Sequence, residues 1–113
     1  MAYTRKNTST NYINNRFMNA ECKLTVAFDT IGGRWTTQIL FCIHFGLNRF
    51  GLIKGRLPRI SDQILGIRLV HLVENKLVIK KSVAGEKIYE LSAKGKTLIP
   101  LLEQLTEWQT NQK

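Results

Sequence analysis

Long apolar runs and cysteines are what this sequence most lacks. No stretch approaches the roughly 18 continuous apolar residues of a membrane span, and the start has no apolar segment of the signal-peptide kind. A cytoplasmic location is therefore expected. The two cysteines, Cys22 and Cys42, belong to no C-x-x-C pair or Cys/His ligand set. We expect no disulfide framework, no metal site and no cofactor.

The short motifs of common enzyme classes are missing too. The sequence contains no G-x-S-x-G, no H-E-x-x-H and no P-loop. His44 and His71 have no partner at the spacing of metal ligands. We therefore expect a binding protein and not an enzyme.

Acidic residues are scarce relative to basic ones. The chain has 8 Asp and Glu against 17 Lys and Arg, which leaves a net charge of +9 on 113 residues. Such a surplus attracts polyanions, so nucleic acid is the first candidate partner and an anionic membrane surface the second. The length and a hydrophobic content of 43% suffice for one domain with one core.

Residues 1–20 are rich in Asn and Thr and carry few apolar side chains. A segment that buries so little does not offset the entropy of ordering it, so we expect a flexible arm. Helical spacing among four apolar residues also favours an arm that docks on a partner subunit. These residues are Tyr12, Ile13, Phe17 and Met18. Residues 21–113 are expected to form the folded domain.

Apolar residues at helical spacing predict four helices in the first two thirds of the chain. The first runs from Cys22 to Ile31, and the second from Trp35 to Phe45, where Gly46 ends it. A third helix from Phe50 stops before Pro58, which lacks an N–H and disfavours helix at the preceding residue.

The fourth helix begins at Ser61, a suitable N-cap, and carries one apolar stripe as far as Val73. Two short helices separated by a brief break match a helix-turn-helix. Leu77 to Val83 and Ile88 to Leu91 are rich in β-formers around a turn of Ala84, Gly85 and Glu86, which predicts a hairpin that serves as a wing.

A last helix is predicted after Ser92, with Pro100 inside it and a kink near residues 96 to 100. Its apolar stripe is long for a terminal helix with little chain left to cover it, which is typical of an interface. The expected fold class is α+β, mainly α: a winged helix-turn-helix with extra helices at both ends.

Three segments resemble one family of regulators. DTIGGRWTTQIL at residues 29–40 is similar to an I-G-G-K/R-W-T signature, and residues 69–78 and 89–108 are similar to later motifs that include Y-x-L-[ST]-x-x-G and L-x-P. From Cys22 to Trp108 the chain resembles the HxlR family of bacterial regulators, a branch of the MarR-like winged helix proteins. Lys76 stands where that family usually has glycine.

The resemblance implies a homodimer whose first and last helices pair while two recognition helices enter successive major grooves. The expected interface consists of Phe17, Leu24, Leu98, Leu101, Leu102, Leu105 and Trp108. Family members are commonly repressors, and some sense electrophiles or oxidants through a cysteine at the place of Cys22. A predicted helix N-terminus and Lys23 beside Cys22 favour a reactive thiolate, and an inert interface cysteine is the alternative.

The recognition helix supplies the candidate base contacts, because its apolar stripe turns the other residues outward. They are Ser61, Asp62, Gln63, Ile67 and Arg68. Gln63 suits adenine, Arg68 suits guanine or a phosphate, and Ile67 suits a thymine methyl group. Ile67 can instead pack on a neighbouring subunit or the wing. Gly66 weakens the helix relative to alanine, which indicates that close packing or the close approach of another group requires a glycine there.

Basic residues around the turn and on the hairpin are the candidate phosphate contacts. They are Arg49, Lys54, Arg56, Arg59, Lys80, Lys81 and Lys87. A solvated basic surface is the alternative.

Together these patterns predict a sequence-specific regulator of transcription, a repressor that binds double-stranded DNA as a homodimer. An electrophile, an oxidant or a small ligand is its expected effector. The alternative is a winged-helix module for protein–protein interaction, which would not need the basic residues around the turn and on the hairpin.

Overall fold

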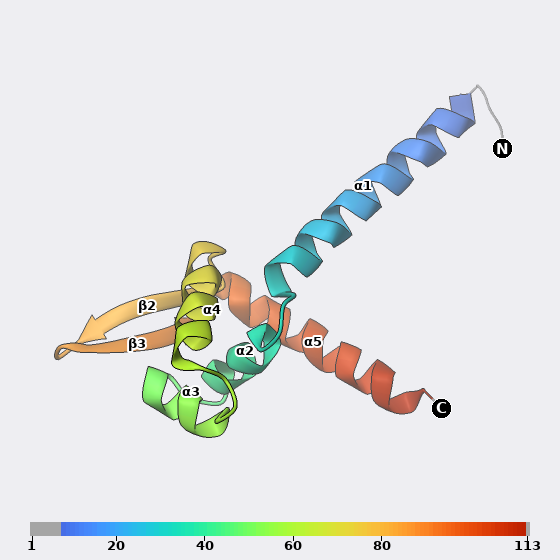
Figure 1. Cartoon of the computed structure of the whole chain (residues 1–113). Helices are drawn as coiled ribbons and strands as arrows, with labels where there is room; N and C mark the ends of the chain where they lie inside the picture. The colour runs from blue at the N-terminus through green and yellow to red at the C-terminus, as the bar shows by residue number, and fades with distance from the viewer. Residues whose placement is uncertain (1–7, 113) are drawn as a thin grey trace. The chain divides into compact units, whose positions relative to one another are not determined.

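The computed structural model describes the backbone of residues 8–112 and the side chains from residue 15 on, apart from residues 17, 18 and 113. The chain divides into two compact units, Met1–Gly32 and Gly33–Lys113. The elements, labelled in Figure 1, are α1 (Thr8–Ile31), α2 (Thr36–His44), α3 (Phe50–Arg56), α4 (Asp62–Glu74), β2 (Val78–Val83), β3 (Glu86–Leu91) and α5 (Ala93–Asn111). None of the described helices is long and apolar enough to cross a membrane.

Helix α1 begins at Thr8, well before the predicted start at Cys22. The helical spacing noted between Tyr12 and Met18 is therefore part of one continuous helix of 24 residues. The side chains of Tyr12, Ile13, Phe17 and Met18 lie outside those described. The placement of Cys22 at a helix N-terminus was wrong, because the helix already has several turns before it.

Helix α2 is the centre of the second unit and contacts α3, α4, β3 and α5. Ile39 and Leu40 on α2 are fully buried, as the apolar run predicted, and Cys42 lies beside them in the core. The other apolar side chains that are almost fully buried are Ile53, Ile60, Leu65, Leu69, Leu72, Leu77 and Val78. Burial on this scale is the main favourable term in the folding of the unit.

Two helices of this unit end in the same way. In both α2 and α4 a Schellman pair of hydrogen bonds closes the last turn. In α2, Gly46 N–H donates to Ile43 O and Leu47 N–H donates to Cys42 O. In α4 the equivalent donors are the N–H groups of Lys76 and Leu77. The residue after the cap is left-handed in both, with φ of 97° at Gly46 and 62° at Lys76. The left-handed backbone at position 76 favours glycine, which accounts for the family's usual residue there.

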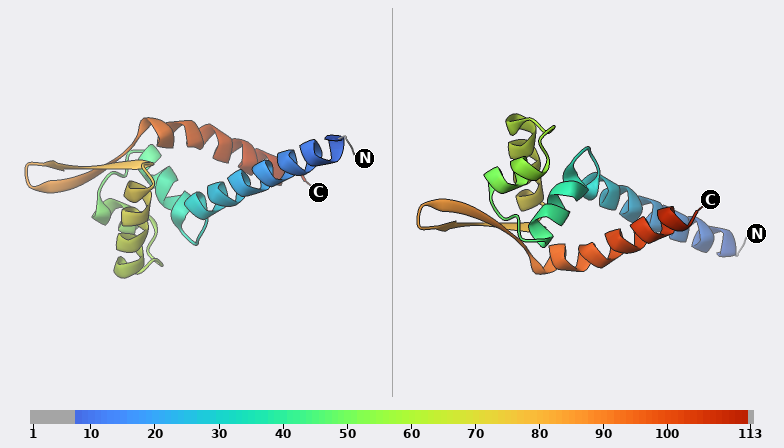
Figure 2. Two further views of the ribbon diagram at one scale, coloured as in Figure 1. Left: turned by 90° about the horizontal axis from the view of Figure 1, so that it is seen from above. Right: turned by 90° about the horizontal axis from the view of Figure 1, so that it is seen from below.

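The hairpin pairs Val78 with Leu91 and Val83 with Glu86. Its turn consists of Ala84 and Gly85, with φ of 52° and 82°, which is a two-residue loop with both φ positive. The predicted turn was one residue longer. Beyond Val78 the whole of β2 is exposed, and Figures 1 and 2 show the hairpin extending past α2 to α4 as a wing.

Helix α5 starts against the base of this wing. The Ser92 hydroxyl accepts from Gly95 N–H at 3.0 Å and donates to the Lys76 carbonyl oxygen at 2.5 Å. A Cβ at Gly95 would overlap the Leu77 carbonyl oxygen, so only glycine allows this approach. The helix then continues through Pro100 as one element to Asn111.

Candidate nucleic-acid interface

Helix α4 has one buried face and one open face. Ser61 caps it through a hydrogen bond from Ile64 N–H to its Oγ at 3.1 Å, as predicted. Leu65, Leu69 and Leu72 pack into the core. The opposite stripe is therefore presented outward, because residues three or four positions apart share one side of a helix.

The open face of α4 is a shallow, mainly apolar recess. Its lining residues are Asp62, Gln63, Gly66, Ile67, Val70, His71 and Glu74. Ile67 is 50% exposed and Val70 is 55% exposed. Three of the five predicted base contacts lie here, and another, Ser61, is exposed at the start of the helix. Val70 was not among the predicted contacts, although its spacing from Gln63 and Ile67 places it on the same face.

Arg68 lies elsewhere. Its Nε donates to the carbonyl oxygen of Arg34 at 3.0 Å, and its guanidinium lies against Gly33. Its position three residues after Leu65 places it on the edge of the buried face, and this spacing was the signal that sequence reasoning overlooked. In this structure Arg68 holds the loop before α2 and does not point outward for bidentate contact with guanine.

That loop explains the second glycine of the signature. Gly33 has a φ of 85°, and a Cβ there would lie 3.3 Å from the Arg68 guanidinium carbon. Trp35 also adopts a left-handed backbone, with a φ of 82°, and the Arg34 guanidinium lies 5.1 Å from its ring centroid. The loop thereby fixes the entry to α2 and gives Arg68 its acceptor.

Three of the predicted phosphate contacts have partners within the protein. Arg49 forms an ion pair with Glu86 at 2.9 Å, and Lys81 forms one with Glu90 at 2.9 Å. Lys54 donates to the carbonyl oxygens of Pro58 and Ile60, so its ammonium group closes the turn before α4. These pairs are exposed or half-exposed, and an exposed ion pair contributes little to stability.

Three other cations are free to meet an anion. Arg59 in the turn, Lys80 on β2 and Lys87 on β3 are exposed, and none of them forms an ion pair with a residue that the structure describes. Lys80 also lines a small recess with Val70 and Glu74, between α4 and the wing. The outward face of α4 therefore adjoins unpaired positive charge.

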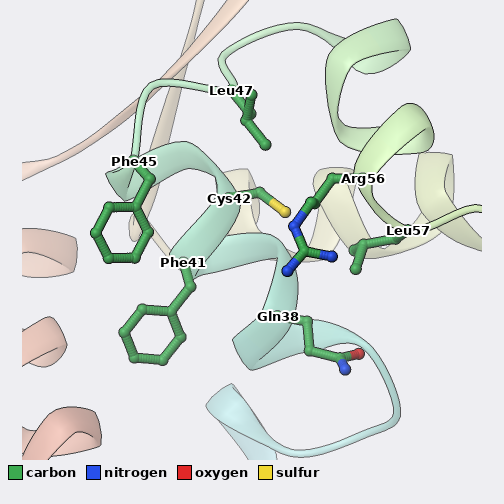
Figure 3. A pocket seen from close by; sticks show the side chains of 7 residues that line it. All are labelled: Gln38, Phe41, Cys42, Phe45, Leu47, Arg56 and Leu57. Carbon is green, nitrogen blue, oxygen red and sulfur yellow. The ribbon is translucent and has the colours of Figure 1, made fainter.

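Arg56, the last candidate, lies on a different surface. It lines a cavity of about 390 Å³ between α2 and α3, shown in Figure 3. The other lining residues are Gln38, Phe41, Cys42, Phe45, Leu47 and Leu57. Burial raises the pKa of the Cys42 thiol, and the positive charge of Arg56 opposes this shift in part. Cys42 is therefore a neutral thiol at physiological pH.

Apolar side chains are exposed on both terminal helices. Leu24 on α1 and Leu101, Leu105 and Trp108 on α5 are each more than half exposed. Leu102 is buried in the core of its own unit, which contradicts its place in the predicted interface, and Leu98 is half-buried. Within two turns of α5, Leu102 is therefore part of the core, whereas Leu101 and Leu105 are on the surface.

The described residues contain no group of three or more His, Cys, Asp or Glu side chains suited to a metal ion. Cys22 is exposed on α1, and Cys42 is buried on α2.

Comparison with known proteins identifies the domain. The sequence model of the HxlR-like helix-turn-helix family matches residues 30–113. The chain is 36% identical to the HTH-type transcriptional regulator YvaP of Bacillus subtilis over 88 residues, which cover 74% of this chain and 81% of YvaP. It is similar to the quinone-bound structure of YodB from B. subtilis, with a TM-score of 0.72, 31% identity and coverage of 80% of this chain and 98% of YodB. The redox regulator HypR in its oxidized form gives a TM-score of 0.73 at 26% identity, over 81% of this chain and 99% of HypR.

Proposed function

The chain belongs to the HxlR-like helix-turn-helix family, and we propose that it is a homodimeric repressor that binds specific double-stranded DNA sequences. The observation that carries this proposal is the outward face of α4, beside which Lys80 lines a recess with Val70 and Glu74. Arg59 in the turn before α4 and Lys87 on the wing are further exposed cations that form no ion pair with a described residue. An α-helix fits the major groove of B-form DNA, and a wing beside it reaches the neighbouring backbone.

The three cations supply affinity, and α4 supplies discrimination between sequences. Each phosphate that a Lys or Arg neutralises releases counterions, so the binding constant falls as salt rises. Phosphate contacts position a protein on the duplex but carry no sequence information directly. Discrimination therefore falls to Ser61, Gln63 and Ile67, at the end of α4 that enters the groove.

A second copy of the chain covers the exposed apolar residues of α1 and α5. Leu24, Leu101, Leu105 and Trp108 would otherwise leave apolar surface in water on both terminal helices. A two-fold dimer buries the same patch on both copies and presents two α4 helices to two half-sites of a palindromic operator.

The proposed signal is an electrophile or an oxidant, with Cys22 as the sensing thiol. Cys22 is exposed, whereas Cys42 is a buried neutral thiol. YodB, which is similar to this chain, has been solved with quinone bound, and HypR in an oxidized form. A quinone should therefore release DNA from the wild type and from Cys42→Ala but not from Cys22→Ser. Equal release from both variants would remove Cys22 as the sensor.

Fluorescence anisotropy with a labelled duplex from the region upstream of the gene tests DNA binding directly. We expect this duplex to bind at least about 10³-fold more tightly than a shuffled one, with an affinity that falls as salt rises. Lys80→Ala should reduce the slope of log K against log salt by about 1. Lys81→Ala is the matched control, because Lys81 is already paired with Glu90. Equal binding to both duplexes would favour the protein-interaction module.

A further inference from the structure

The outward face of α4 carries no lysine or arginine side chain. Its residues Gln63, Gly66, Ile67 and Val70 line a recess whose surface is mainly apolar. The one arginine of α4, Arg68, is bound to the Arg34 carbonyl oxygen. Guanine is most commonly read by Arg or Lys that donates to its O6 and N7. This face therefore lacks the usual means of recognising guanine.

Gly66 widens the recess. A Cβ at Gly66 would have no other heavy atom within 4 Å, so nothing inside the protein requires glycine at this position. Glycine in a helix interior weakens the helix relative to alanine. The missing methyl group therefore leaves the α4 backbone open to a molecule outside the chain.

Resting on the proposed DNA binding, we propose that this recess receives the C5-methyl groups of thymine, with Gly66 as the opening and Ile67 and Val70 as its apolar walls. Thymine is the base that presents a methyl group in the major groove, and apolar side chains are its usual contacts. Gln63, on the same face, can pair with the N6 and N7 of adenine. Helix α4 therefore reads A·T pairs.

The surrounding charge favours DNA over a protein as the occupant of this recess. Arg59, Lys80 and Lys87 are exposed without ion pairs among the described residues, and the chain carries a net charge of +9. The acidic residues of the face do not offset this. Asp62 lies 3.9 Å from the Lys54 ammonium group, and Glu74 is at the last turn of α4, away from the end that enters the groove.

The test begins with the full chain and a pool of random-sequence duplexes. Repeated selection for binding should enrich a motif whose half-sites contain A·T pairs. Each thymine of that motif is then replaced in turn by deoxyuridine, which lacks only the methyl group. We expect binding to weaken about four-fold at each contacted thymine, from the loss of one buried methyl group.

Variants connect this loss to the recess. Ile67→Ala should remove the difference between thymine and deoxyuridine at one position, because the wall that contacts the methyl group is gone. Gly66→Ala should raise the melting temperature and weaken binding to the selected duplex. Gly51→Ala is the matched control: Gly51 also lies in a helix with nothing near its Cβ position, so this variant should keep full affinity.

The outcomes separate this inference from the proposed function. If the wild type enriches a motif but deoxyuridine costs nothing at every thymine, or if the half-sites contain no A·T pairs, the thymine-methyl inference is overturned and DNA binding stands. If the wild type enriches no motif at all, the proposed function fails first. Full affinity in Gly66→Ala would remove the role of Gly66.

Discussion

Arg68 on α4 packs directly against Gly33 in the loop before α2, with its guanidinium carbon 3.3 Å from the position of a Cβ on that glycine. The same side chain donates from Nε to the carbonyl oxygen of Arg34. Gly33 and Arg34 in the loop are thus held against α4 by one side chain. Arg68 is a positioning residue: it links α4 to the loop before α2.

Removal of this contact should loosen α4 without removing a base contact. We expect Arg68→Ala to lower the free energy of unfolding by about 1 kcal/mol, the net worth of one hydrogen bond. Affinity should fall by a similar factor for operator and for unrelated duplexes, measured by anisotropy. A selective loss for operators with guanine at one position would show instead that Arg68 reads that base.

The two helix ends at Gly46 and Lys76 should respond in opposite directions to substitution. Lys76→Gly removes the strain of a left-handed backbone at a residue that carries a Cβ. We therefore expect the free energy of unfolding to rise by about 1 kcal/mol. Gly46→Ala creates the same strain and should lower it by about 1 kcal/mol. Urea denaturation measures both. A decrease for Lys76→Gly would mean that the lysine side chain stabilises the fold by more than its backbone costs.

Gly95 should be intolerant of any side chain. A Cβ there would overlap the Leu77 carbonyl oxygen, which belongs to the backbone and cannot turn aside. We expect Gly95→Ala to lower the free energy of unfolding by about 2 kcal/mol or more, since steric overlap in a packed region costs 1–3 kcal/mol. Gly51→Ala, with open space around its Cβ position, should instead be neutral or stabilising. Equal effects of the two substitutions would contradict the close approach of α5 to Leu77.

Stability should decline at alkaline pH because two buried groups resist ionisation. Burial raises the pKa of the Cys42 thiol and of the Tyr89 hydroxyl in the folded state. The folded chain then keeps protons that the unfolded chain loses, so the free energy of unfolding falls as pH rises through the unfolded-state values, about 8.5 for Cys and about 10 for Tyr.

Urea titrations between neutral and alkaline pH would measure this decline. Tyr89→Phe should remove the part of the decline near the higher of the two values and leave the part near the lower. Cys42→Ala should do the reverse. A decline that is unchanged in both variants would place its origin in other groups.

The proposed dimer should dissociate when charge is placed on the exposed stripe of α5. We expect Leu101→Glu combined with Leu105→Glu to give a monomer by light scattering while the far-ultraviolet circular dichroism is retained, because both side chains are exposed within one chain. Gln104→Glu adds charge to the same helix at an exposed polar position and is the control. A dimer that survives the double substitution would place the interface elsewhere.

Elements whose boundaries depend on neighbouring residues were predictable. Ser61 and Ser92 as N-caps, Pro58 as a stop and Gly46 after α2 all act through hydrogen bonds or backbone angles within one turn, and each was found where the sequence indicated. The resemblance to the HxlR family likewise depended on short local motifs. The start of α1 was missed because its apolar spacing continues weakly through an Asn- and Thr-rich segment.

Contacts between distant segments were decided by the tertiary structure. Nothing local to Arg68 reveals that a carbonyl oxygen 34 residues earlier accepts its Nε–H, or that Glu90 neutralises Lys81 across the hairpin. Leu102 and Leu105 lie in the same apolar stripe of α5, yet Leu102 is buried and Leu105 is exposed. Helix α5 packs on α2 and β3, and its residues from 103 to 112 are all exposed. A sequence specifies which side chains can bind or pack, whereas their partners depend on where the chain returns in space.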